Sequence, residues 1–274
     1  MEILSDTSAL VLMWAGTNCY NTDKAKEYLE KLDLSAGQLL YDQCNEVCSY
    51  YDEVIKNRKW GIFSLLNQVL SRQNKDCQLV IAAAGLDPLG IEISEYYPEV
   101  RIFELDKENM DIKFNLYNSL CGNKYENIAF IETDILNTMS VQKSLSNYGW
   151  DPKKNTILVL EGISYYLSTE SIQKFIQVLH PDFIIFEFLK EDENIASDKA
   201  SIPKEIFGII FDYCNISEIR RDSYSKLENT FNNMFIIKKY NMKYLEAMRT
   251  GNNSFFPTKE SGWIEVCLLA KELL

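Results

Sequence analysis

An apolar stretch ends at a turn of small residues, Ala83 to Asp87, and Asp106 closes the next apolar stretch. Small residues after a strand let the backbone approach a ligand, and an acid ending the following strand accepts hydrogen bonds from ribose hydroxyls. This pattern is typical of proteins that hold a nucleotide-like cofactor. Because Gly85 is the only glycine of the turn, a buried strand followed by a tight turn in any α/β protein is an alternative interpretation.

Two later apolar stretches also end in an acid, at Asp134 and at Glu161. In a doubly wound sheet the carboxyl ends of such strands converge around one crevice. An acid after the third strand suits the exocyclic amine of adenine, and Glu161 after the fourth suits an ammonium group. Each acid alone is also a good helix N-cap, but the four strand ends together favour a cofactor site.

The elements that must position these residues alternate between strands and helices. Short apolar segments predict strands at Leu79–Ala83, Val100–Leu105, Ile128–Glu132, Thr156–Leu160 and Phe183–Phe188. Helical spans are expected between and after them at Ile91–Tyr97, Lys107–Leu120, Val141–Tyr148 and Thr169–Leu179. Such alternation predicts a doubly wound α/β fold, with a parallel sheet covered by helices on both faces.

The two ends of the chain differ in texture from this central part. The first 75 residues are predicted to be mainly helical, with Thr22 capping one helix and further helices at Tyr41–Ile55 and Trp60–Leu70. A helix is expected through Phe207–Tyr213. The chain closes with strands at Phe235–Tyr240 and Trp263–Ala270, joined by a long link and expected to be antiparallel.

We therefore predict a single domain over residues 1–274. It comprises a helical cap (1–75), a cofactor-binding core (76–189), a substrate-side insertion (190–233) and a closing strand pair (234–274). No internal repeat or linker divides the chain.

Composition narrows the classes of partner. The formal net charge is −12, and no basic cluster is longer than Arg220–Arg221 or Lys238–Lys239, so nucleic-acid binding is not expected. The acidic start and the absence of a membrane-length apolar run predict a cytoplasmic protein with no membrane partner. Seven cysteines and one histidine suggest reduced thiols and no metal site, with Cys44 and Cys48 packing a helix. Oligomeric state stays open.

Longer segments around these acids carry a resemblance to a known family. They are Asn57–Gly61, Cys77–Asp87, Phe103–Asp106, Glu132–Asp134 and Leu160–Leu167. From about Asn57 to Leu179 the chain resembles the leucine carboxyl methyltransferase family of S-adenosylmethionine-dependent O-methyltransferases, with weaker likeness at Ser5–Ala9 and the C-terminal strand pair. The resemblance implies a Rossmann-like, mostly parallel seven-stranded sheet, with S-adenosylmethionine as cofactor and S-adenosylhomocysteine as product.

The resemblance also implies roles at the methionine end of the cofactor. Arg58 matches the arginine that pairs with the cofactor's carboxylate, a task that suits a planar guanidinium. The turn containing Ala83, Gly85 and Asp87 would lie under the methionine portion, and Glu161 would line it.

At the other end, Asp106 would take the ribose hydroxyls, and Asp134 with the backbone N–H of Ile135 would bind the adenine. Tyr166 would face the site of methyl transfer, so Tyr166 and Glu161 are the candidate catalytic residues. Two departures stand out: the family usually has Gly where this chain has Ala83, and a basic residue expected near Val11–Leu12 is missing.

The chemistry of the acceptor follows from the scarcity of bases. Methyl transfer from a sulfonium is an in-line displacement, in which alignment supplies much of the rate. A carboxylate acceptor is already ionised at neutral pH, whereas a hydroxyl needs a base, commonly histidine. His180, the single histidine, is predicted to face solvent at a helix end. A carboxylate acceptor is therefore favoured, although an acid such as Glu161 could serve a hydroxyl.

The acceptor pocket is expected between the N-terminal helices and the 190–233 insertion. Candidate lining residues are aromatic, with ordinary core packing as the alternative for each: Tyr20, Tyr50, Tyr51, Trp60, Tyr165 and Tyr213. We predict methylation of a small, natural-product-like molecule. The alternatives are a protein C-terminal carboxyl methyltransferase and a non-catalytic S-adenosylmethionine-binding module.

Overall fold

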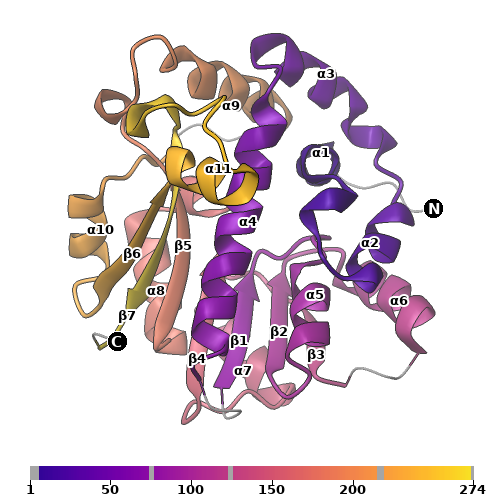
Figure 1. Cartoon of the computed structure of the whole chain (residues 1–274). Helices are drawn as coiled ribbons and strands as arrows, with labels where there is room; N and C mark the ends of the chain where they lie inside the picture. The colour runs from indigo at the N-terminus through magenta and orange to yellow at the C-terminus, as the bar shows by residue number, and fades with distance from the viewer. Residues whose placement is uncertain (1–5, 74–76, 123–125, 215–218, 273–274) are drawn as a thin grey trace.

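The computed structural model describes residues 6–73, 77–122, 126–214 and 219–272. Within them the chain forms a seven-stranded sheet in the order β3-β2-β1-β4-β5-β7-β6 (Figure 1). The strands are β1 (Cys77–Ala82), β2 (Arg101–Asp106), β3 (Ile128–Glu132), β4 (Asn155–Leu160), β5 (Phe183–Leu189), β6 (Phe235–Asn241) and β7 (Ile264–Ala270). The first five strands are parallel, and β7 lies antiparallel between β5 and β6. The predicted fold class is confirmed.

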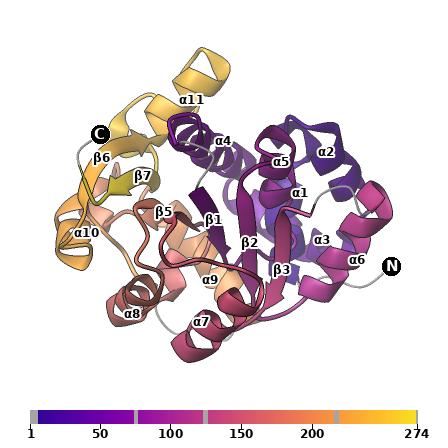
Figure 2. The same ribbon diagram turned by 90° about the horizontal axis from the view of Figure 1, so that it is seen from below.

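Helices cover both faces of the sheet because its central strands are buried on both sides. Leu79 and Ile81 of β1 join the apolar core on one face, whereas Val80 and Ala82 join the core on the other. The first face carries α4 (Tyr51–Leu70), α5 (Leu89–Tyr96), α6 (Met110–Cys121) and α11 (Met242–Thr250). The second carries α7 (Thr138–Asn147), α8 (Thr169–Leu179) and α10 (Tyr224–Thr230). Figure 2 shows α4 and α5 on one side of the sheet and α7 and α8 on the other.

A helical cap lies beyond the carboxyl ends of the parallel strands (Figure 1). It consists of α1 (Asp6–Ala15), α2 (Asp23–Glu30) and α3 (Gln38–Val47), with α9 (Ser201–Cys214) from later in the chain. As predicted, Thr22 caps α2, and its side-chain oxygen accepts a hydrogen bond from the N–H of Ala25. The packing of α3 on α9 holds the cap together, and the packing of α1 on α4 joins it to a helix that packs on the sheet.

Two predicted helix boundaries in the N-terminal part were wrong. Instead of separate helices at Tyr41–Ile55 and Trp60–Leu70, α3 ends at Val47 and α4 runs unbroken for 20 residues. The polar residues near Arg58 looked like a break, but they are buried within α4 and face the interior. Gly61, also within α4, has no side chain and so leaves room for α11: a Cβ there would lie 2.8 Å from Leu245.

The predicted long link between the last two strands contains a helix, α11. Its ends carry ordinary signals: the side chain of Asn241 accepts from the N–H of Tyr244, and Gly251 ends the helix with a φ of 79°. Within the described residues, no helix combines the length and the apolar character needed to cross a membrane.

Candidate active site

The turn after β1 is built from residues with left-handed backbone. Ala83 and Gly85 have φ angles of 51° and 50°. The turn is fastened to β2, because the N–H of Ala84 donates to the carbonyl of Leu105 and the N–H of Gly85 donates to Oδ2 of Asp106 at 2.8 Å. Glycine adopts this conformation freely, but alanine does so at a cost of roughly 1–2 kcal/mol. Both residues hold the turn open towards the space above the sheet.

A buried ion pair supports the same turn from beneath. Glu104 on β2 and Lys113 on α6 are fully buried, with Nζ of Lys113 2.5 Å from Oε2 of Glu104. The same Nζ donates to the carbonyl oxygens of Gly85 and Asp87, and Oε1 of Glu104 accepts the N–H of Gly90. The backbone from Gly85 to Gly90 is therefore held at several points by two side chains.

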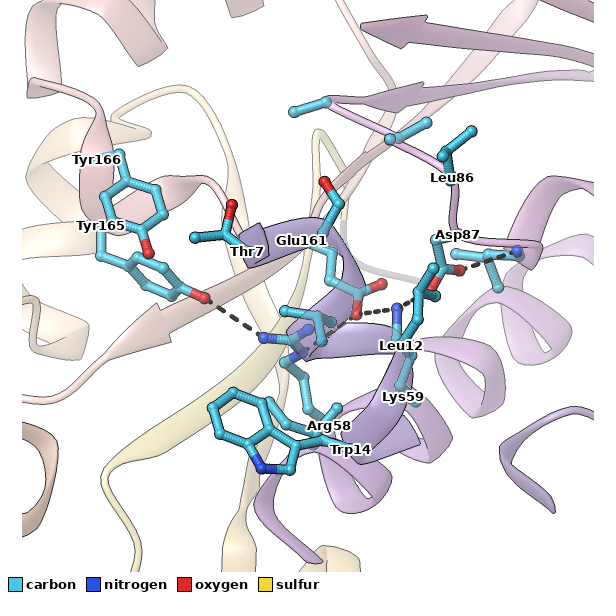
Figure 3. Close-up of a pocket in the computed structure, with 18 of the residues that line it drawn as sticks. Thr7, Leu12, Trp14, Arg58, Lys59, Leu86, Asp87, Glu161, Tyr165 and Tyr166 are labelled. Atoms are coloured by element: carbon cyan, nitrogen blue, oxygen red, sulfur yellow. Dashed lines mark hydrogen bonds and ion pairs between the residues drawn. The ribbon is translucent and has the colours of Figure 1, made fainter. Parts of the chain in front are cut away.

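A cavity of about 210 Å³ opens above this turn. Its floor comes from the end of β1 and from Glu161 and Gly162, which directly follow the neighbouring strand β4. The strand order reverses between these two strands, and α/β sheets bind ligands outside the carboxyl ends of strands at that point. The other walls of the cavity come from α1 and α4 (Figure 3) and from α9.

Part of the cavity lining consists of charged side chains, which we call the charged network. Arg58 and Lys59, neighbours on α4, both reach Oε1 of Glu161, at 3.1 Å from Nε and 2.7 Å from Nζ respectively (Figure 3). Lys59 also pairs with Asp87. The guanidinium of Arg58 further donates to the hydroxyl of Tyr165 at 3.3 Å. Four charged side chains thus form one connected network at the cavity wall.

A third carboxylate, Glu187 on β5, lies behind this network. It is fully buried, 3.6 Å from a guanidinium nitrogen of Arg58, and Oε2 accepts the N–H of Gly162 at 2.6 Å. Gly162 has a φ of 69°, so the turn after β4 also depends on left-handed backbone. Burial raises the pKa of Glu187 above its ordinary value, and Arg58 opposes this.

The charges of the other members are set by their mutual contacts. Burial works against the charged form of Lys59, but Asp87 and Glu161 raise the pKa of its ammonium. Burial similarly works to raise the pKa of Asp87, but the ammonium of Lys59 brings it below the ordinary value. Glu187 and Glu161 raise the pKa of the Arg58 guanidinium despite its burial. Arg58, Lys59 and Asp87 are therefore charged at neutral pH.

Most other side chains that line the cavity are apolar or aromatic. Val11, Leu12 and Trp14 line it from α1, Phe207 and Ile210 from α9, and Tyr165 and Tyr166 from η4 (Ser164–Tyr166). The rings of Tyr165 and Phe207 meet edge to face, with centroids 5.1 Å apart. These apolar and aromatic side chains can accommodate a flat or branched apolar molecule next to the charged network.

Many of the residues predicted from the sequence meet at this cavity. Its lining includes Tyr51, Arg58, Ala83, Gly85, Asp87, Glu161, Tyr165 and Tyr166. Tyr20 does not line it, but its buried hydroxyl donates to Oδ2 of Asp87 at 2.8 Å and so supports the wall.

The three residues predicted for the ribose and adenine lie outside the cavity lining, farther along the same sheet edge. Asp106 ends β2 and is joined to the turn through Gly85. Asp134 follows β3 and is exposed, with Oδ1 accepting the N–H of Leu136, and Ile135 beside it is buried. Since β1, β2 and β3 are neighbours, these residues follow the order expected for methionine, ribose and adenine. Their roles stay predictions.

Besides Tyr20, two more predicted pocket residues do not line this cavity, and another cannot be placed. Trp60 follows Lys59 on α4, but successive helical residues point about 100° apart, and its partly buried ring packs against the core. Tyr50 stacks on Phe255 and accepts a hydrogen bond from Lys199. Tyr213 is on α9, and its side chain is outside the described residues.

Sequence reasoning missed two charged members of the site. Lys59 directly follows Arg58 in a run of polar residues inside an apolar helix, and Glu187 is the one acid in the apolar run of β5. A charge within a buried segment is a signal, because burial of an unpaired charge is costly. His180, by contrast, is exposed at the end of α8, as predicted.

The fold is similar to that of solved α/β proteins that include methyltransferases. It superposes on a DUF574 family protein from Streptomyces avermitilis with a TM-score of 0.67, at 13% identity and 97% coverage of both chains. A candidate methyltransferase from Thermobifida fusca gives a TM-score of 0.64, at 14% identity and coverage of 93% and 96%. Geranyl diphosphate C-methyltransferase from Streptomyces coelicolor, solved with S-adenosyl-L-homocysteine, gives 0.50 at 10% identity, covering 81% of this chain and 79% of that one.

The particular family follows from the sequence. The model of the leucine carboxyl methyltransferase family matches residues 11–180, so the chain belongs to that family. It is an S-adenosylmethionine-dependent methyltransferase, as the resemblance implied. Among curated proteins, no sequence match is found.

Proposed function

We propose that this methyltransferase esterifies the carboxyl group of a small, hydrophobic, natural-product-like molecule. The observation that carries this proposal is that one cavity is lined both by a charged network and by several apolar and aromatic side chains. The charged network suits the methionine portion of the cofactor. The apolar and aromatic side chains suit the body of the acceptor. The acceptor's reactive oxygen would then meet the cofactor next to the charged network.

The residues of the charged network fit the cofactor's methionine portion. Its carboxylate would pair with Arg58, and its ammonium with Glu161 and Asp87, which line the same wall. Asp106 would receive the ribose hydroxyls, and Asp134 with the N–H of Ile135 the adenine. When bound, S-adenosylmethionine supplies a methyl group activated by a positively charged sulfur.

The described lining favours an acceptor that is already ionised. It contains no histidine, and its two carboxylates, Asp87 and Glu161, are both held in ion pairs. A hydroxyl acceptor would have to lose a proton to one of them, whereas a carboxylate needs no base. Tyr166 lines the cavity next to Tyr165 and would orient the acceptor for in-line attack (Figure 3).

The size of the cavity and its apolar lining favour a small molecule as the acceptor. The cavity measures about 210 Å³, and helices α1 and α9 contribute several of its apolar residues. Ligand pockets of this kind hold mostly apolar molecules and fix their orientation through a few polar groups.

The test uses S-adenosylmethionine with an isotopically labelled methyl group. The enzyme is incubated separately with panels of hydrophobic carboxylic acids, of phenols and alcohols, and of peptides ending in a free carboxylate. Methyl esters release labelled methanol in mild alkali, whereas methyl ethers do not. We expect alkali-labile label on one or more small acids.

Alkali-stable label on phenols or alcohols alone would contradict the assignment to a carboxyl group. Ester formed on the peptides alone would contradict the assignment to a small molecule and favour a protein carboxyl methyltransferase.

A further inference from the structure

Lys59 is a buried cation to which neither the sequence prediction nor the proposed mechanism gives a role. Its side chain is only 7% exposed, and it lines the cavity beside Arg58. Its ammonium is held between two carboxylates, those of Asp87 and Glu161. A buried ammonium is costly unless it is paired, so Lys59 must keep an anionic partner in every state of the site.

The geometry around Glu161 shows where a carboxylate is held in this cavity. One oxygen, Oε1, lies 3.1 Å from Nε of Arg58 and 2.7 Å from Nζ of Lys59. Two cations from adjacent positions of α4 therefore converge on a single carboxylate oxygen (Figure 3). Each cation also pairs with a further acid, Glu187 for Arg58 and Asp87 for Lys59.

The methionine portion of the cofactor brings both an ammonium and a carboxylate into this network. If its ammonium pairs with Asp87 and Glu161, it competes with Lys59 for both of that residue's partners. Since Lys59 is buried within α4, it cannot turn to bulk water instead. The carboxylate that enters with the same ligand is the anion within reach.

We propose that Lys59 is a second cofactor-binding cation, which together with Arg58 clamps the carboxylate of the methionine portion. This inference rests on the proposed placement of the cofactor. On binding, the cofactor's carboxylate replaces Glu161 between the two cations, and Glu161 turns to the cofactor's ammonium. The change is an exchange of ion pairs, so no buried charge is left without a partner.

The test compares the affinities of two ligands by calorimetry. S-adenosylhomocysteine carries the carboxylate, and its decarboxylated analogue lacks only that group. Lys59→Met should weaken binding of S-adenosylhomocysteine about 10- to 100-fold, as expected for losing one charge-assisted hydrogen bond. The affinity for the decarboxylated analogue should change less than about threefold, because the lost partner is absent from that ligand.

Lys56→Met is the matched control, because Lys56 lies on the same helix but pairs with Asp52 and Glu53 away from the cavity. It should change neither affinity. Unchanged or tighter binding of S-adenosylhomocysteine by Lys59→Met would overturn the proposal, and so would an equal loss of both ligands. Failure of the wild-type protein to bind either ligand would instead contradict the proposed cofactor site as a whole.

A crystal structure of the wild-type protein with S-adenosylhomocysteine gives an answer that does not depend on how the variant folds. We expect Nζ of Lys59 within about 3.2 Å of the ligand's carboxylate. Lys59 still paired with Asp87 and Glu161, and out of contact with that carboxylate, would overturn the proposal.

Discussion

Ala83 holds a backbone conformation that its side chain disfavours. Its φ of 51° lies in the left-handed region, as does that of Gly85 two residues later. The sequence comparison with the family already singled out Ala83 as a departure from glycine, and the structure supplies the physical consequence. The methyl group lines the cavity, so the strain is located at the cofactor turn itself.

Replacing Ala83 with glycine should relieve this strain. Ala83→Gly is expected to raise the free energy of unfolding by about 1 kcal/mol, since left-handed backbone costs alanine more than the entropy that glycine adds to the unfolded chain. Urea denaturation measures the change. Gly85→Ala is the converse control and should destabilise by a similar amount. An Ala83→Gly protein less stable than the wild type would show that the methyl group contributes packing that outweighs the strain.

At the residue scale, Arg58, Asp87 and Glu161 were predicted, whereas Lys59 and Glu187 were not. Glu161 and Asp87 could be found because each follows an apolar run that reads as a strand. Lys59 and Glu187 were missed because their relevance depends on which side chains face one another across the cavity. Local spacing carries no such information for residues that are 28 or more positions apart, as Lys59 and Asp87 are.

At the scale of elements, the turn after β1 is positioned by its neighbours β2 and α6. The buried pair of Glu104 and Lys113 joins these two elements and holds the turn's carbonyl groups. Burial raises the pKa of Glu104 to about 7, and Lys113 limits the rise. The contacts that support the turn after β1 therefore depend on whether the carboxyl group of Glu104 is protonated.

This coupling predicts a pH dependence of stability. Between pH 4.5, the ordinary value for Glu104, and about pH 7, the folded chain keeps a proton that the unfolded chain has lost. The free energy of unfolding should therefore fall as the pH rises through this window, by about 1–3 kcal/mol from this group.

The measurement is urea denaturation at pH 5 and pH 7.5, with a double variant, Glu104→Gln with Lys113→Met, as the reference. Other acids contribute to both proteins and cancel in the comparison. The wild type should lose more stability than the double variant between the two pH values. Parallel behaviour of the two proteins would show that Glu104 is ionised in the folded state even at pH 5.

The sequence predicted strands better than helix ends. Strands buried on both faces form continuous apolar runs, which is why β1 to β5 were found to within two residues. The boundary inside α4 was misplaced because its buried Arg58 and Lys59 broke the apolar pattern. Helix α11 was missed although Asn241 and Gly251 mark its ends. The apolar runs of the strands on either side gave a stronger signal than this short helix between them.

At the scale of the whole molecule, the site joins distant parts of the chain. Its walls come from α1, α4, the ends of β1 and β4, and α9, which lies beyond β5 in the sequence. We propose that the chain is a single domain, because the cap packs on α4 and α4 packs on the sheet. The parallel, doubly wound sheet was predictable from the alternation of elements, whereas the docking of the cap was not, because it depends on tertiary packing.

The central claim is that this cavity binds the methionine portion of S-adenosylmethionine through Arg58. The most direct measurement is calorimetric titration of S-adenosylhomocysteine into the wild type and Arg58→Met, with Arg72→Met beyond the end of α4 as the control. We predict one ligand per wild-type chain, the same affinity in Arg72→Met, and binding about 10- to 100-fold weaker in Arg58→Met. Wild-type affinity in a folded Arg58→Met protein, or no binding by the wild type, would contradict the account.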